Sequence, residues 1–175
     1  YDVNLTAPYI APQLNADEVY ENIVTRLEEA FEMDALPMKA AAGNEGRVTK
    51  AMAYMLYAET VMYQNDESRY SAALDCMDEI INSGQFSLVP DFASIWEESG
   101  EWGPESIWEI NYISEGAARS WGSPINSGGS VYPMLTGVPG APEASGYKGG
   151  WGFGPVAQSA WDMYAEDDTR RDGGI

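Results

Sequence analysis

The stretch that decides the fold is Arg47–Phe86, RVTKAMAYMLYAETVMYQNDESRYSAALDCMDEIINSGQF. Its first half carries apolar residues at the i, i+3, i+4, i+7 spacing of one helix face, which predicts a helix with a core-facing stripe. The stripe consists of Val48, Ala51, Met52, Met55, Leu56, Met62 and Tyr63, interrupted by Glu59 and flanked by Tyr57. The second half repeats this spacing with Tyr70, Ala73, Met77, Ile80 and Ile81. We therefore expect two antiparallel helices.

Local signals mark the ends of these two helices. Asn65 and Asp66 interrupt the apolar pattern, and either side chain can cap the first N–H groups of the next helix. Ser83 and Gly84 end the second helix, because glycine readily takes the left-handed conformation. Two alanine-rich helices of this length have the scale of a tetratricopeptide unit, whose period is about 34 residues. Such a pair cannot bury its apolar face alone, so a helical partner is expected beside it.

The residues before the helix pair predict a further helix. Asn15 and Glu18 have the spacing of a capping box, in which each side chain accepts a hydrogen bond from the other residue's backbone N–H. An amphipathic pattern continues from there to about Met33, and Pro37 ends it. This helix can cover part of the apolar face of the pair.

The residues after the helix pair change in character. Residues 106–113 alternate in a way that indicates a short, largely covered strand. Residues 114–154 form a long excursion rich in glycine and aromatic residues, and Pro155 opens a closing helix over 155–166. We therefore expect one mostly α domain over 1–175 with a helical core over 15–113, tetratricopeptide-like hairpins and little β-structure.

The composition excludes several classes of function. The chain has 28 acidic and nine basic residues and a net charge of −19, which argues against a surface for nucleic-acid phosphates or anionic membranes. It contains no histidine, which removes the usual general base and most transition-metal sites. Cys76 is the only cysteine, so it cannot form an intrachain disulfide and is expected in the core. No cofactor is expected, and a calcium site built from carboxylates stays open.

The aromatic residues of the 114–154 excursion are the candidate binding groups. Flat aromatic rings can stack on the C–H face of a sugar while amides and acids take its hydroxyl groups. The candidate glycan-binding residues are Trp121, Tyr132, Tyr147 and Trp151, with Asn126, Glu143 and Lys148 as hydrogen-bonding neighbours. The alternative is that these rings only pin a glycine-rich loop to the helical body. Long loops in compact domains often carry function, which keeps the binding hypothesis open beside this one.

Other aromatic and acidic residues are given structural roles. Trp96 and Trp108 are expected to be buried, whereas Trp102 could be either buried or exposed. Glycoside hydrolysis needs only two carboxylates, and an acidic cluster is present at Glu97, Glu98, Glu101, Glu105 and Glu109. No spacing sets a distance between two of these groups, and such clusters are common in an acidic chain. We therefore do not expect an enzyme.

Four runs of sequence together resemble the SusD/RagB family of outer-membrane nutrient-binding lipoproteins. They are GRVTKAMAYMLYAETVMY (46–63), RYSAALDCMDEIINSGQFSLVPDFASIW (69–96), PESIWEINY (104–112) and WGFGPVAQSAWDMYAEDDTRRDGGI (151–175). The family pattern has a Gly-Arg-x-Thr-Lys helix start, an alanine-rich helix pair, a Glu-x-Ile-aromatic-Glu-Ile segment and a helix ending in Asp-x-Arg-Arg. These runs match that pattern in order over most of the chain.

The resemblance implies a function that composition alone does not give. SusD-like proteins are surface-exposed lipoproteins of the outer membrane that capture oligosaccharides, polysaccharides or other nutrients without covalent chemistry. They pass the ligand to a SusC-like, TonB-dependent transporter. The resemblance further implies that this chain is an internal fragment, with its signal and lipidated cysteine, its only membrane contact, outside it. The competing hypotheses are a tetratricopeptide-like protein–protein scaffold and, after it, a glycosidase.

Overall fold

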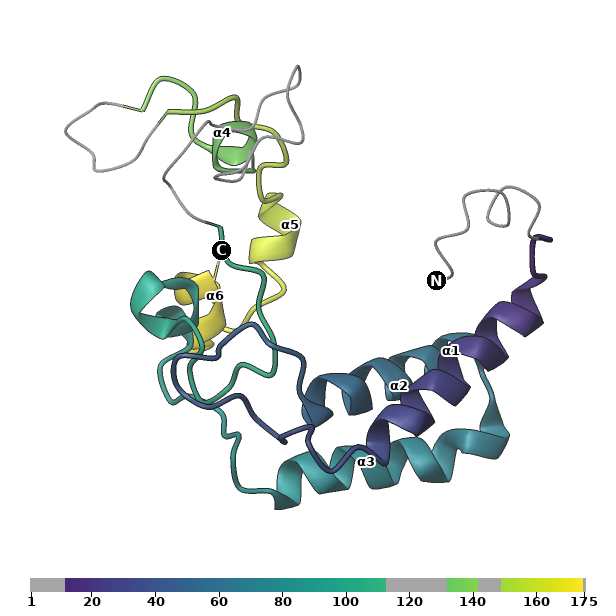
Figure 1. Ribbon diagram of the computed structural model, residues 1–175. Coiled ribbons are helices and arrows are strands. Elements are labelled where there is room, and N and C mark those ends of the chain that lie inside the picture. The colour runs from purple at the N-terminus through teal and green to yellow at the C-terminus, as the bar shows by residue number, and fades with distance from the viewer. Residues whose placement is uncertain (1–11, 113–131, 142–148, 175) are drawn as a thin grey trace, which may run out of the picture. The chain divides into compact units, whose positions relative to one another are not determined.

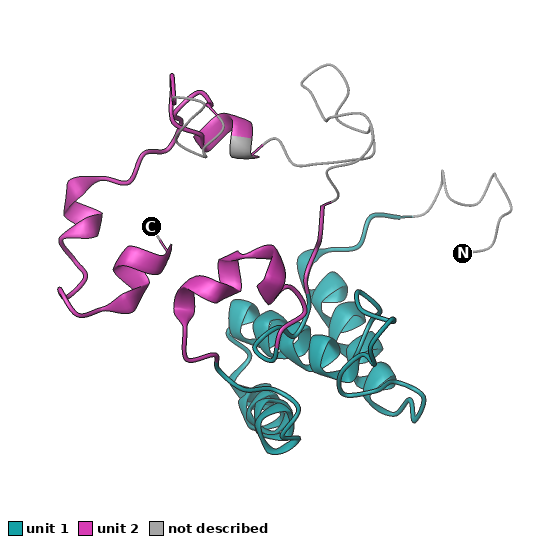
Figure 2. Ribbon diagram, turned by 90° about the vertical axis from the view of Figure 1, so that its left-hand side faces the viewer, with its two compact units in different colours: residues 1–88, 104–108 teal, residues 89–103, 109–175 magenta. Residues whose placement is uncertain are grey.

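The computed structural model describes residues 12–112, 132–141 and 149–174 (Figure 1). Every regular element within these ranges is a helix, which confirms the mostly α prediction. The chain divides into two compact units, Tyr1–Leu88 with Pro104–Trp108, and Val89–Gly103 with Glu109–Ile175 (Figure 2). No described helix has both the length and the apolar character needed to cross a bilayer.

The first unit is built on three helices. They are α1 (Ala16–Phe31), α2 (Lys50–Gln64) and α3 (Tyr70–Asn82), with a short 3₁₀ helix, η2 (Glu67–Arg69), just before α3. Helix α2 packs against both α1 and α3 (Figure 1). The expected helix pair is therefore α2 and α3, and the helix expected before it is α1.

The predicted helix ends are confirmed, because they depend on local hydrogen bonds. Asn15 and Glu18 form the capping box, with N–H to side-chain oxygen distances of 2.9 and 3.0 Å. Asn65 takes the left-handed conformation at the end of α2, with a φ of 58°, and the Asp66 side chain then caps η2. Gly84, with a φ of 64°, follows the end of α3. Helix α1 ends at Phe31, slightly earlier than expected.

The prediction of the buried α2 face was wrong for most of its residues, although Ala51 and Tyr57 are buried as expected. The buried residues of α2 are Ala51, Ala53, Tyr54, Tyr57 and Val61. Most of the predicted stripe is exposed, and Tyr63 reaches 92% exposure. Helix α2 is apolar on nearly every side, so helical spacing alone allows more than one core face. The buried face is the one whose alanines let neighbouring helices approach and whose tyrosine hydroxyls find acceptors.

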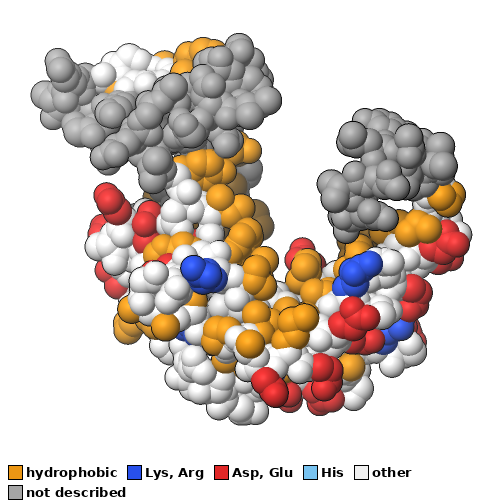
Figure 3. Space-filling view, viewed as in Figure 1, with side chains coloured by type: hydrophobic (Ala, Val, Ile, Leu, Met, Phe, Trp, Pro, Cys, Tyr) orange, Lys and Arg blue, Asp and Glu red, His pale blue; other side chains and the backbone are white. Residues whose placement is uncertain are grey.

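The exposed part of the predicted stripe leaves apolar side chains on the surface of the first unit. They are Val48, Met55, Leu56, Met62 and Tyr63, and Ile81 of α3 is exposed as well. Figure 3 shows that apolar and acidic side chains lie next to each other on the described surface. By contrast, Ala73, Cys76 and Ile80 of α3 are buried as expected.

Two buried tyrosines of α2 have partners that explain their burial. Tyr54 donates to Oε2 of Glu79 at 2.6 Å, and Tyr57 donates to Oε1 of Glu28 at 3.2 Å. The Phe31 ring meets both tyrosine rings edge-on, at centroid distances of 4.8 and 5.3 Å. Burial and then the Glu28 carboxylate raise the pKa of Tyr57 to about 12. The ring contacts join α1 to α2, and the Tyr54–Glu79 hydrogen bond joins α2 to α3.

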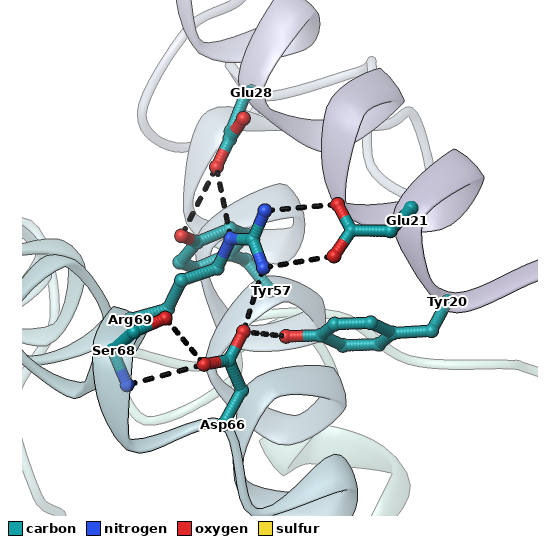
Figure 4. Close-up of polar contacts among 7 residues, drawn as sticks. All are labelled: Tyr20, Glu21, Glu28, Tyr57, Asp66, Ser68 and Arg69. Carbon is teal, nitrogen blue, oxygen red and sulfur yellow. Dashed lines mark hydrogen bonds and ion pairs between the residues drawn. The ribbon is translucent and has the colours of Figure 1, made fainter. Parts of the chain in front are cut away.

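A polar cluster fastens α1 to the α2–α3 turn (Figure 4). Arg69 forms ion pairs with Asp66 at 2.6 Å and with Glu21 of α1 at 2.9 Å. Tyr20 donates its hydroxyl to Oδ2 of Asp66 at 2.8 Å. Hydrogen bonds from Ser68, and then from Arg69 and Tyr20, hold the pKa of Asp66 well below its usual range. The Asp66 carboxylate therefore caps a helix and joins two helices at once.

The second unit consists of short helices. They are η3 (Phe92–Trp96), η4 (Glu98–Gly100), α4 (Tyr132–Thr136), α5 (Gln158–Trp161) and α6 (Thr169–Gly174), and α6 packs against η3. The strand expected over 106–113 is absent from its described part, 106–112, where no partner strand provides a ladder. The helix expected over 155–166 is reduced to α5, because Ala157 has an extended backbone with a ψ of 142°.

Candidate functional site

Two of the four predicted binding residues lie in the described part of the chain. Tyr132 begins α4, and Trp151 lies on the segment 149–154, which we call the aromatic strap. Trp121 and Tyr147 lie outside the described residues, as do Asn126, Glu143 and Lys148. The site is therefore built from α4 and the aromatic strap.

Backbone hydrogen bonds fix the aromatic strap against the end of α4. The N–H of Trp151 donates to the carbonyl of Met134 at 2.9 Å, and that of Phe153 donates to Leu135 at 2.8 Å. The N–H groups of Gly150 and Gly152 donate to carbonyls just beyond, at 3.2 and 2.9 Å. The last carbonyls of a helix have no partner within it, so the strap satisfies groups that water would otherwise solvate.

Glycine is required at two strap positions. A Cβ on Gly150 would lie 2.6 Å from the Met134 carbonyl oxygen and 2.6 Å from the Gly137 Cα. Gly152 has a φ of 69°, and a Cβ there would lie 2.6 Å from the Pro139 ring. Gly150 and Gly152 thus allow the strap backbone to contact the α4 end directly.

The rings on this scaffold are held in place and exposed. Tyr132 is 68% exposed, Trp151 is 48% exposed and Phe153 is 57% exposed. Trp151 and Phe153 meet edge-on, with ring centroids 5.6 Å apart. An exposed ring with a fixed backbone and a neighbouring ring is suited to stacking on a sugar face. Phe153 was not among the predicted binding residues, although its spacing from Trp151 in an extended segment was a usable signal.

The prediction that Trp96 and Trp108 are buried was wrong. Trp96 is 66% exposed and Trp108 is 43% exposed. Trp96 ends a short 3₁₀ helix, so it has only one turn of neighbours, among them the Phe92 ring at a centroid distance of 5.9 Å. A single tryptophan in an apolar stretch of sequence does not show whether its side chain will be buried in the fold.

The acidic cluster that raised the hydrolase hypothesis makes local hydrogen bonds. Glu109 accepts from the backbone N–H of Trp102 at 2.8 Å and from the Asn111 amide at 3.2 Å. Glu97 accepts from the Ser99 hydroxyl at 3.3 Å. The described residues contain no group of three or more acidic or cysteine side chains placed to hold a metal ion. Glu97 and Glu109 are therefore both hydrogen-bonded to neighbouring residues.

Comparison with known proteins gives matches among solved structures. No family model and no curated protein matches the chain. The chain is 51% identical, over 91% of its length, to surface glycan-binding protein A from Bacteroides thetaiotaomicron in complex with laminarihexaose, with a TM-score of 0.84. It is 42% identical, over 95% of its length, to surface glycan-binding protein A from Bacteroides fluxus, with a TM-score of 0.85. A laminarin-binding SusD-like protein shares the fold over 92% of the chain, at 23% identity and a TM-score of 0.73.

Over most of its length the chain therefore has a fold similar to part of a SusD-like protein, in agreement with the family resemblance. The chain spans about a third of the length of these structures, with 34% of the first and 36% of the other two covered. In particular, it is similar to part of the surface glycan-binding proteins A of Bacteroides, which are named as binding proteins.

Proposed function

We propose that this chain is the ligand-binding middle part of a cell-surface protein that captures an oligosaccharide. The observation that carries the proposal is the 51% identity, over 91% of the chain, to a protein solved with laminarihexaose. A similar ligand, a neutral glucan oligosaccharide, is therefore proposed here. The exposed rings on α4 and the aromatic strap supply the matching chemistry.

Binding would proceed by stacking and hydrogen bonding, without a covalent step. Trp151 and Phe153 offer adjoining rings to the C–H faces of consecutive sugars. Tyr132 adds a third ring, and its hydroxyl can exchange hydrogen bonds with sugar hydroxyls. Because the strap is tied to α4 before any ligand arrives, little conformational entropy is lost on binding. Trp121 and Tyr147 remain proposed binding residues from the sequence.

The role of the whole protein is also proposed by resemblance. The glycan would be passed to a SusC-like, TonB-dependent transporter, and the protein would be held at the outer-membrane surface by a lipid anchor outside this chain. We propose one domain over 1–175 within that longer protein. Neither nucleic acid nor a membrane surface would be a partner of these residues, because their net charge is −19. We propose no enzymatic activity.

A protein–protein scaffold is the second candidate function, and one observation favours it. Met55, Leu56, Met62 and Tyr63 give α2 an exposed apolar face, which is the kind of surface that binds an amphipathic helix. In that case the rings of α4 and the strap would serve only to hold the loop. The unchanged chain would then bind no glycan, and truncating a ring would make no difference.

Native affinity electrophoresis against neutral and acidic polysaccharides tests the proposed function. We expect a glucan such as laminarin to retard the chain. The Trp151→Ala and Tyr132→Ala variants should each bind laminarihexaose at least about tenfold more weakly in calorimetry, which corresponds to losing about 1.4 kcal/mol. Met163→Ala, which also truncates an exposed side chain, should bind as the unchanged chain does.

The alternatives predict different results in the same experiment. If a polysaccharide retards the unchanged chain and all ring variants equally, α4 and the strap are not the binding site. Absence of retardation by every polysaccharide, for this chain and for the longer protein, would overturn the glycan proposal and favour the scaffold. Release of reducing sugar during the incubation would instead reveal a glycosidase.

A further inference from the structure

The region η3–η4 carries the most exposed tryptophan that the structure describes. Trp96 is 66% exposed, compared with 48% for Trp151 on the aromatic strap. It lies at the last position of η3, and the Phe92 ring supports it edge-on at a centroid distance of 5.9 Å. Within the described residues, an indole this exposed is accessible to a ligand.

The backbone that carries Trp96 is tightly fixed. A Cβ on Gly100 would collide with the Ser94 carbonyl oxygen, so η4 folds back directly against η3. On the other side, a Cβ on Gly174 would lie 2.6 Å from the Phe92 ring. The Asp91 side chain caps η3 by accepting from the Ala93 N–H at 3.1 Å. The exposed indole thus stands on a rigid support rather than on a loose loop.

A second tryptophan, two residues after η4, has an unfavourable backbone conformation. Trp102 has a φ of 55°, in the left-handed region that bulky residues seldom adopt. The Glu109 carboxylate accepts its N–H at 2.8 Å, and the next N–H, from Gly103, donates to the Gly100 carbonyl at 3.1 Å. Backbone strain held by such contacts occurs preferentially at ligand sites. The backbone that carries Trp96 and the backbone of Trp102 are therefore each held by several contacts within the described residues.

We propose that the η3–η4 turn, residues 92–103, is a second sugar-binding surface, with Trp96 as its stacking platform and Trp102, six residues further along the chain, as its second ring. The ligand class is a neutral oligosaccharide, and the inference rests on the proposed function. The Ser99 hydroxyl and the Glu97 carboxylate, 3.3 Å apart, lie on the same turn and can hydrogen-bond sugar hydroxyls. A polysaccharide repeats its units, so a second surface would increase the avidity for a long glycan.

Indole N–H resonances of the chain labelled with ¹⁵N-tryptophan test this directly. The chain has six tryptophans, and single Trp→Phe variants assign each resonance. On titration with laminarihexaose, the Trp96 resonance should shift in a saturable manner. The Trp161 resonance should stay unchanged, because that ring is largely covered and lies 5.1 Å from the Arg171 guanidinium. Maltohexaose and cellohexaose serve as further probes.

Affinity measurements on variants complete the test. We expect Trp96→Ala to weaken binding of laminarin by about tenfold or more, with an unchanged circular dichroism spectrum, because the side chain is exposed. Trp108→Ala, which removes another exposed tryptophan, is the matched control and should bind normally.

The outcomes separate this inference from the function on which it rests. If Trp151 shifts while Trp96 does not, and Trp96→Ala binds normally, the second surface is refuted and the proposed function stands. If no oligosaccharide binds and no polysaccharide retards the chain, both are refuted together.

Discussion

Truncating Tyr57 should destabilise the chain strongly, whereas truncating Tyr63 on the same helix should not. Tyr57 is 1% exposed and Tyr63 is 92% exposed. A buried aromatic side chain removes about 150–250 Å² from water. At about 25 cal/mol per Å², losing the whole side chain costs about 4–6 kcal/mol, before any cavity is counted. Aromatic-to-alanine changes in cores cost about 3–5 kcal/mol, and a surface change costs less than about 0.5 kcal/mol.

Urea unfolding near neutral pH, followed by far-UV circular dichroism, measures both variants against the unchanged chain. Domains of this size are stabilised by about 5–15 kcal/mol, so Tyr57→Ala should retain only part of the original free energy of unfolding. If it does not fold, Val61→Ala and Met62→Ala replace the pair. Deleting the buried Val61 methyls should cost about 1.6 kcal/mol, and truncating the exposed Met62 should cost almost nothing.

The pair of variants decides which α2 face is buried. Equal losses for Tyr57→Ala and Tyr63→Ala would refute the assignment, and so would a larger loss for Tyr63→Ala. The Tyr57→Phe variant isolates the hydroxyl that donates to Glu28, whose removal should cost about 1 kcal/mol.

Two further predictions concern the polar cluster and the aromatic strap. The folded pKa of Asp66 lies below its unfolded pKa of about 4, so its carboxylate stabilises the fold above that pH and loses this contribution as pH falls. Asp66→Asn should therefore be less stable than the unchanged chain near neutral pH. The two urea midpoints should begin to converge as pH falls below about 4 and should meet only once the folded carboxyl is protonated; a gap independent of pH would contradict the linkage. Gly150→Ala should weaken laminarihexaose binding in calorimetry, because its Cβ would meet backbone at 2.6 Å, whereas Gly149→Ala, with a nearest contact of 3.7 Å, should not. Equal affinities for the two glycine variants would show that the strap does not depend on this close approach.

Much of the local structure was predictable, because its causes lie within a few residues along the chain. Helix ends depend on hydrogen bonds or backbone angles of adjacent residues. This holds for the Asn15–Glu18 capping box and for the left-handed residues Asn65 and Gly84 at the ends of α2 and α3. The ordered family-like runs also predicted a SusD-like fold, which the likeness to a SusD-like structure over 92% of the chain confirms. For the candidate site, the glycine and aromatic residues of 114–154 indicated the excursion that contains the proposed binding residues, and this stays a prediction.

Tertiary structure alone decided which apolar side chains are covered. Helix α2 is apolar on nearly every side, so periodicity could not choose between the face of Tyr57 and the face of Tyr63. The Tyr57 face is buried because α2 packs against α1 and α3 and because the Tyr57 hydroxyl donates to Glu28. In the same way, the exposure of Trp96 and the pairing of Trp151 with Phe153 depend on residues that come together only in the folded chain. Caps are set by local chemistry, whereas burial is set by neighbours that are distant in the sequence.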